Sequence, residues 1–292
     1  MTHEPVMTAE VTAWLAPRAD GLYLDCTVGL GGHAAALLDA GAGRVIGLDR
    51  DPAALAHAAA RLQAFGARAE LVHADYRSVA DVLGARGIAG VDGALADLGV
   101  SSMQLDDAAR GFSFRHDGPL DMRMDPTSGT TLADRLADVD EATLAAVLTE
   151  FGEERHARRI ARAIVTAQAH RPLTGTAELA SVVRRASGGG KWRRIDPATR
   201  TFQALRIWVN DELGGLRVLL EAVLHVLHRG GRLVLIAFHS LEDRIVKHTF
   251  RHLEQTGQGR VLTRKPQAPG LDEQERNPRA RSAKLRVMEK VA

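Results

Sequence analysis

The first hundred residues alternate between two patterns of apolar and polar positions. Short apolar runs typical of strands are separated by alanine-rich stretches in which apolar residues recur every three or four positions, the period of a helix. Short strands that alternate with helices indicate βαβ units and a parallel sheet. The predicted strands are Leu22–Val28, Arg44–Leu48, Ala69–His73 and Val91–Asp97, and the helices between them are Ala34–Ala40, Pro52–Phe65 and Ser78–Arg86.

The strand pattern stops after residue 100. From Ser101 to about Ala198 no strand is predicted, and the polar stretch GFSFRHDGPLDMRMDPTSG is followed by helical periodicity. The predicted helices here are Leu132–Ala137, Glu141–Glu150, Glu154–Ala169 and Thr176–Ala186. We therefore expect a sheet domain in two parts, 1–104 and 199–292, interrupted by a helical insert, 105–198, that recognises the substrate.

The α/β pattern returns in the last third of the chain. A long helical pattern covers about Arg200 to His228, and the segment Gln267–Ala280, which contains Pro, Gly and charged residues, is expected to be a mobile loop. The other predicted elements are strand Arg232–Phe238, helix Leu241–Gln255, and strands near Val261 and at Ala283–Glu289.

The composition indicates a soluble cytosolic protein. Of 292 residues, 45% are hydrophobic and 25% charged, and the net charge of +2 provides no overall field toward nucleic acid, so any basic surface must be local. Cys26 is the only cysteine, which excludes an internal disulfide. The N-terminus lacks the pattern of a signal peptide, and the longest strongly apolar run, Leu233–Phe238, is too short to span a membrane. We expect a cytoplasmic protein that does not bind membranes.

A glycine loop after the first strand indicates a nucleotide-like cofactor. The sequence Gly29-Leu-Gly31-Gly32-His33-Ala34 satisfies G-x-G-x-x-A, a pattern that glycines needed only for a tight turn would also satisfy. Acidic residues at the ends of three strands add to this signal, because the carboxyl ends of parallel strands face one crevice. These residues are Asp25, Asp49 and Asp97.

The three carboxylates favour S-adenosylmethionine over NAD. They attract its sulfonium and ammonium groups by an energy on the order of a few kcal/mol at partly buried range, whereas they repel the pyrophosphate of a dinucleotide. Asp49, at the end of the second strand, is placed to bind a ribose diol. Tyr76 follows the third strand, where it either covers an adenine or packs in the core.

Long irregular motifs resemble those of a known family over nearly the whole chain. The motifs are GLGGH, DRDP, DLGVSS, RGFSF, GPLDMRM, ATRTFQALRIWVN, FHSLEDR and NPRARSAKLR. They resemble the MraW (RsmH) family of ribosomal RNA small-subunit methyltransferases. The resemblance implies a class I methyltransferase fold with a helical domain inserted after the fourth strand. It also implies methyl transfer from S-adenosylmethionine to N4 of one cytosine in the decoding region of bacterial 16S rRNA, within the small ribosomal subunit. The cofactor positions it implies are Gly31, Gly32, His33, Asp49, Tyr76, Asp97 and Gln104.

The chemistry of cytosine limits the candidate catalytic residues. Methylation at C5 needs a cysteine nucleophile, and Cys26 is expected to be a small buried residue beneath the cofactor. Methylation at N4 needs an acceptor for a proton, for which Asp97 is the best candidate unless it contacts only the cofactor. Further polar candidates in the same loop are Ser101, Ser102, Gln104 and Asp106. His239 either orients the base or belongs to a helix start capped by Ser240, with Asp243 in the first turn. No metal site is predicted.

Contact with RNA is assigned to local basic residues. A basic loop with an aromatic residue suits phosphate contact and base stacking, although a solvated surface loop has the same composition. The candidate RNA-binding residues are Arg115, Lys191, Trp192, Arg193, Arg194 and Arg200. The alternatives are a DNA amino-methyltransferase, a NAD-binding oxidoreductase and a non-catalytic ribosome-assembly factor. No oligomeric state is predicted.

Overall fold

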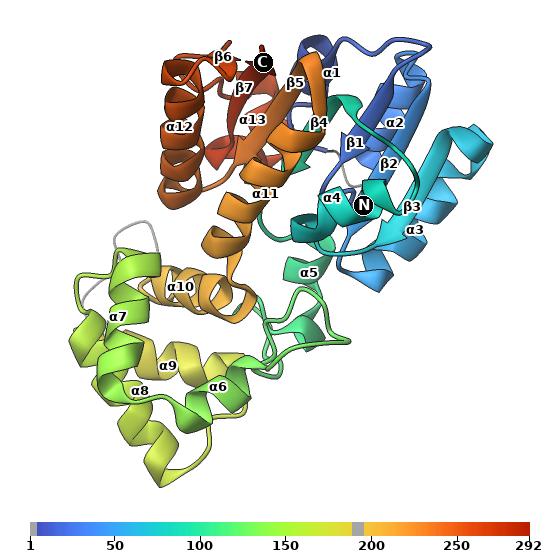
Figure 1. Cartoon of the computed structure of the whole chain (residues 1–292). Coiled ribbons are helices and arrows are strands. Elements are labelled where there is room, and N and C mark those ends of the chain that lie inside the picture. The colour runs from blue at the N-terminus through green and yellow to red at the C-terminus, as the bar shows by residue number, and fades with distance from the viewer. Residues whose placement is uncertain (1–4, 189–195) are drawn as a thin grey trace. The chain divides into compact units, whose positions relative to one another are not determined.

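The computed structural model describes residues 5–188 and 196–292, which form two compact units (Figure 1). The sheet unit consists of Met1–Gly99 and Leu213–Ala292, and the helical unit of Val100–Glu212. The helical unit is thus longer at both ends than the expected insert, 105–198. In particular, helix α10 (Ala198–Asn210), which the expected boundaries assigned to the sheet domain, lies in the helical unit.

The sheet has the order β3-β2-β1-β4-β5-β7-β6 among the described residues. Strands β1 to β5 pair in parallel, and β7 is antiparallel to both β5 and β6, so the sheet is mostly parallel with a late antiparallel strand. The strands are β1 (Leu22–Asp25), β2 (Arg44–Asp49), β3 (Ala69–His73), β4 (Val91–Asp97), β5 (Leu227–Ala237), β6 (Gly259–Val261) and β7 (Lys284–Lys290).

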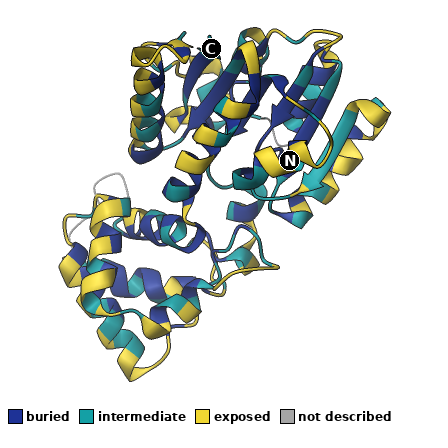
Figure 2. Ribbon diagram, in the orientation of Figure 1, coloured by how far each residue is buried: buried dark blue, intermediate teal, exposed yellow. Residues whose placement is uncertain are grey.

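Helices cover both faces of the sheet (Figure 1). Because side chains alternate along a strand, Leu233 and Leu235 of β5 join the core on one face while Val234 and Ile236 join the core on the other. The first face is covered by α4 (Val79–Gly84), α11 (Glu212–Val226) and α12 (Ser240–Gln255), and the second by α1 (Thr8–Leu15), α2 (Gly32–Asp39) and α3 (Pro52–Leu62). Figure 2 shows the strands between these layers as mostly buried.

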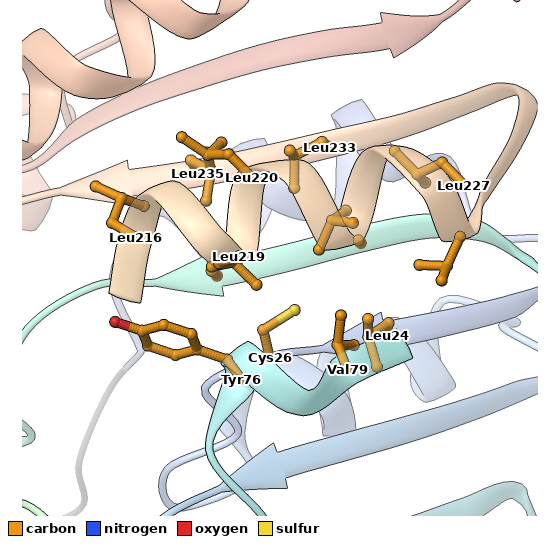
Figure 3. Close-up of a cluster of buried hydrophobic side chains, with 14 of the residues drawn as sticks. Leu24, Cys26, Tyr76, Val79, Leu216, Leu219, Leu220, Leu227, Leu233 and Leu235 are labelled. Atoms are coloured by element: carbon orange, nitrogen blue, oxygen red, sulfur yellow. The ribbon is translucent and has the colours of Figure 1, made fainter. Parts of the chain in front are cut away.

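The first face holds a leucine-rich core beneath α11. Figure 3 shows Leu216 and Leu219 of α11 in one cluster with Leu24, Cys26 and Val79. Cys26 is buried there, and burial raises the pKa of its thiol well above the ordinary range. The expectation that Cys26 is a small buried residue is confirmed.

The helical unit has its own apolar core, formed by residues such as Leu144, Leu148 and Ile160. Its polar stretch is held by the buried side chain of Asn210, which donates to the carbonyl of Met122 (2.7 Å) and accepts from the amide of Met124 (2.8 Å). Met122, the first of the two, has the left-handed φ of 60°. The helices are α5 (Ser102–Asp106), α6 (Leu132–Asp138), α7 (Glu141–Gly152), α8 (Ala157–His170), α9 (Thr176–Ala186) and α10.

The expected long helix Arg200–His228 is wrong. Helix α10 ends at Asn210, Asp211 takes the left-handed φ of 47°, and α11 begins at Glu212. The helical pattern also ends early, because β5 begins at Leu227. Because both helices are amphipathic and only Asp211 separates them, the helical periodicity continues across the break and did not indicate it.

The segment Gln267–Ala280 is not a loop without structure. It contains helix α13 (Leu271–Arg276), followed by a 3₁₀ turn, and it binds the N-terminal part of the chain. Glu273 accepts from the amide of Met7 (2.7 Å), and Gln267 accepts from the indole N–H of Trp14 (2.8 Å). The 3₁₀ helices are Gln63–Arg68, Tyr76–Ser78, Ala108–Arg110 and Pro278–Ser282.

Within residues 5–188 and 196–292, no helix has the length and apolar composition needed to cross a membrane.

Candidate active site

The glycine loop joins β1 to α2 with backbone angles that favour glycine. Gly29 and Gly31 have φ of 52° and 77°, and the amide of Gly31 donates to the carbonyl of Val28 (2.7 Å). A Cβ on Gly31 would lie 3.3 Å from Ala58 of α3, and one on Gly32 would lie 2.8 Å from Pro5. Local geometry and close packing thus require these glycines whether or not a ligand binds.

Asp25 and Asp97 end the neighbouring strands β1 and β4. Asp25 is fully buried; its Oδ1 accepts from the amide of Thr27 (3.2 Å), and its Oδ2 has no hydrogen-bond partner within the described chain. The backbone amide of Asp97 donates to Oγ1 of Thr27 (2.7 Å), while its buried Oδ1 also lacks a partner there. Thr27 was not anticipated from the sequence, yet it ties the loop to both strands.

His33, in the first turn of α2, lies beside these acids. Its Nε2 is 3.6 Å from Oδ2 of Asp97, and neither ring nitrogen has a hydrogen bond within the described part of the protein. Burial lowers the pKa of His33, but the carboxylates of Asp97, Asp25 and Glu273 outweigh burial, so that the pKa is raised above its ordinary value. Nothing in the sequence indicated that Glu273 acts on His33, which precedes it by 240 positions.

The cluster of Asp25, His33 and Asp97 suits a cationic ligand. Burial raises the pKa of Asp25 to about 7, which shows how poorly its charge is compensated. Buried polar atoms without partners are costly, and a bound group that donates hydrogen bonds removes that cost. The ammonium of S-adenosylmethionine is such a donor, whereas a pyrophosphate would add negative charge to a site that is already acidic.

Asp49, at the end of β2, holds the loop through both carboxylate oxygens. Oδ2 accepts from the amide of Gly29 (2.8 Å) and Oδ1 from the amide of Asp51 (2.9 Å), while burial raises the pKa of Asp49. Each oxygen has a second lone pair, so these bonds leave acceptor capacity for a ribose diol.

Two further residues expected to bind the cofactor have structural roles. Tyr76 is buried in the core cluster near Leu216 (Figure 3), with the guanidinium of Arg50 5.9 Å from its ring centroid. Gln104 lies in the helical unit, where its side chain accepts from the amide of Ser101 (3.0 Å) and completes a capping box of α5. Their contacts with a cofactor stay predictions.

His239 caps α12. Its Nδ1 accepts from the amide of Glu242 (3.4 Å), whose carboxylate accepts in return from the amide of His239 (3.4 Å). The expected helix start is therefore present, but the expectation that Ser240 caps it is wrong. Asp243 lies in the first turn, as expected, and accepts from Arg286 (2.6 Å). A role of His239 toward the base stays a prediction.

The candidate RNA-binding residues are only partly described. Arg115 is exposed, and Arg200, at the start of α10, is exposed and donates to the carbonyl of Glu153 (3.2 Å). The basic loop residues Lys191, Trp192, Arg193 and Arg194 lie outside the described residues.

The sheet order, the antiparallel β7, the glycine loop after β1 and the acidic residues at the strand ends define a class I S-adenosylmethionine-dependent methyltransferase. Residues 1–291 match the model of the MraW methylase family, and the chain belongs to this family. This membership confirms the expected fold and cofactor and excludes the NAD-binding alternative.

Curated relatives match the chain over nearly its full length. It is 52% identical to a protein named ribosomal RNA small subunit methyltransferase H from Anaeromyxobacter sp. (strain K), with 99% of this chain and 98% of the relative covered. A relative of the same name from Geotalea uraniireducens is 48% identical with the same coverage. Among solved structures, an rRNA methylase from Streptococcus thermophilus superposes with a TM-score of 0.47 at 12% identity, covering 98% of this chain and 94% of that one.

Proposed function

We propose that this protein transfers a methyl group from S-adenosylmethionine to the exocyclic N4 of one cytosine in the decoding region of bacterial 16S rRNA. The observation that carries the proposal is the near-complete match, at about half identity, to relatives named ribosomal RNA small subunit methyltransferase H. The substrate is the rRNA within the small ribosomal subunit, and the reaction takes place in the cytoplasm.

The cofactor supplies an electrophilic methyl group when it is bound. Asp49 accepts hydrogen bonds from the ribose hydroxyls, and the backbone of the loop at Gly31 and Gly32 lies next to the ligand. The unpartnered oxygens of Asp25 and Asp97 and the ring of His33 surround the amino acid end. Tyr76 covers the adenine, and Gln104 remains the other proposed cofactor-binding residue.

The amine of cytosine is a weak nucleophile because its lone pair is delocalised into the ring. The protein must hold N4 about 3–3.5 Å from the methyl carbon and provide an acceptor for the proton that N4 loses. The buried, unpartnered Oδ1 of Asp97 provides that acceptor at the end of β4, and His239 orients the base from the end of β5.

Methylation at the alternative position of cytosine, C5, is disfavoured because Cys26 is not accessible as a nucleophile. Attack on C6 needs an accessible thiolate, but this sole cysteine is buried in the core and its pKa is raised by burial. The one thiol of the chain is therefore not available to attack C6.

The helical unit recognises the rRNA. Arg115 and Arg200 are exposed there, and the basic residues Lys191, Arg193 and Arg194 precede Arg200 closely in the sequence. A target base must be presented unstacked, and a unit inserted directly after β4 provides a surface for that purpose.

The reaction is tested with small ribosomal subunits from cells that lack this methylation. Subunits are incubated with the protein and isotopically labelled S-adenosylmethionine, and the digested nucleosides are separated by mass spectrometry. We expect one labelled N4-methylcytidine per subunit, and no transfer of label to a DNA oligonucleotide of the same sequence. Label in 5-methylcytidine would contradict the proposed position, and cofactor binding without transfer would indicate the assembly-factor alternative.

Asp49→Ala is expected to weaken the binding of S-adenosylhomocysteine about ten- to a hundredfold. The loss of charge-assisted hydrogen bonds costs about 1.5–3 kcal/mol, and the amide of Gly29 loses its acceptor as well. Calorimetry measures the affinity, with Asp39→Ala at the exposed end of α2 as the matched control. An affinity equal to that of the unchanged protein would show that Asp49 does not bind the cofactor.

A further inference from the structure

One helix of the sheet unit has a basic surface that the proposed RNA contacts do not include. Helix α12 buries Leu241, Val246, Phe250 and Leu253 against the sheet. The residues on its other side are predominantly basic: Arg244, His248, Arg251 and His252 are exposed, and Lys247 is half-buried between them. We call these five residues the basic face of α12. Arg244, His248 and Arg251 are spaced by four and three residues, so they lie along one side of the helix.

The acidic residues of α12 offset this face only in part, because Glu254 alone among them is exposed. Glu242 is buried and caps the helix, and Asp243 is bound by Arg286 (2.6 Å) and lies 3.6 Å from the ammonium of Lys284. Glu254, near the C-terminal end, accepts from the amide of Val261 (3.1 Å). In contrast, the side chains of four basic residues make no hydrogen bond or ion pair within the described residues: Lys247, His248, Arg251 and His252.

The basic face begins close to the candidate active site. Helix α12 follows directly after β5, whose carboxyl end lies next to that of β4, where Asp97 is found. From Arg244 to Arg251 the helix rises about 10 Å, which is about the rise of three nucleotides in one strand of a nucleic acid helix.

The chemistry of the basic face favours a phosphate-bearing nucleic acid over a lipid surface as its partner. With a net charge of only +2 over the chain, a cluster of basic residues on one helix is a local feature. Lipid binding would need an apolar face, but the apolar side of α12 is already packed on the sheet and none of its large apolar residues is exposed.

We infer that the basic face of α12 binds backbone phosphates of the substrate RNA next to the target nucleotide. This inference rests on the proposed function and assigns part of the RNA-binding surface to the sheet unit.

The double variant Lys247→Ala/Arg251→Ala tests this surface. We expect the Kd for small subunits to rise on the order of tenfold, and the slope of log K against log salt to decrease by about 0.7–0.9 for each lost contact. The KM for subunits should rise while kcat and the affinity for S-adenosylhomocysteine stay unchanged. The matched control is Arg18→Ala/Arg229→Ala, which removes the same charge from exposed residues near the amino ends of β1 and β5. Melting temperatures of all three proteins show whether each is folded.

This experiment distinguishes a failure of the α12 assignment from a failure of the proposed function. A double variant whose subunit affinity and salt slope equal those of the unchanged protein would overturn the assignment of α12, as would an equal loss in the control variant. Failure of the unchanged protein to methylate subunits would contradict the proposed function instead, and the salt slope of binding would still decide whether α12 contacts RNA.

Discussion

Asp97→Asn is expected to slow methyl transfer to small subunits by about 10²–10⁴-fold, the range that general base catalysis contributes. The substitution keeps the size of the side chain but removes the charge and one acceptor at the end of β4. The backbone amide of Asp97, which donates to Thr27, is unaffected, so the loop should keep its position. Single-turnover rates at saturating cofactor measure the effect on the chemical step.

The same variant separates two roles of Asp97. If Asp97 contacts only the cofactor, the affinity for S-adenosylhomocysteine falls and the rate at saturation stays near normal. If it accepts the proton, the rate falls at saturation. In either case the pKa of His33 should fall toward its ordinary value, because Asp97 is the main group that raises it. Asp81→Asn, on the exposed surface of α4, is the control. Normal rate and normal affinity together would exclude Asp97 from the site.

Asp25→Asn is expected to stabilise the cofactor-free protein at neutral and alkaline pH and to weaken cofactor binding. Burial raises the pKa of Asp25 from 3.8 to about 7, so the folded protein binds a proton that the unfolded chain has already lost between these pH values. Stability therefore falls as pH rises from about 4 to about 7, and then stays level. The difference amounts to about 4 kcal/mol, at 1.36 kcal/mol for each pH unit.

Denaturant unfolding at pH 5 and pH 8 measures this dependence. The unchanged protein should lose stability between the two values through Asp25, and the Asn variant should lose less. Its Oδ1 can still accept from the amide of Thr27, and the neutral amide replaces the oxygen that has no partner. At pH 8 the variant should bind S-adenosylhomocysteine at least tenfold more weakly, because the ammonium of the ligand loses a charged acceptor. A variant less stable than the unchanged protein at pH 8 would contradict this account.

Much of the sheet unit could be predicted from the sequence because its signals are local. The predicted strands Ala69–His73 and Val91–Asp97 agree with the structure to the residue, and the acids Asp49 and Asp97 end their strands as expected. A strand buried on both faces appears as an apolar run, and the residue that ends it is read directly from the sequence.

Features that depend on tertiary contacts could not be predicted in this way. Asp211 separates two helices through a left-handed backbone, a conformation that no local pattern demanded of an aspartate. The helix of Leu271–Arg276 follows a stretch with the composition of a loop, and its Glu273 is bound to Met7, far away in the sequence. The sequence also could not show that His239, rather than Ser240, caps α12.

The attachment of the N-terminal segment to the end of the chain has a consequence for the order of folding during synthesis. Met7 is bound by Glu273, Trp14 by Gln267, and Arg232 donates to the carbonyl of Trp14 (2.8 Å). Pro5, just before Met7, packs at Gly32 of the cofactor loop. These partners leave the ribosome long after the loop itself, and contacts so distant in sequence form slowly. A nascent chain can therefore complete the packing around its cofactor loop only after Gln267 and Glu273 have emerged, long after the loop itself has been made.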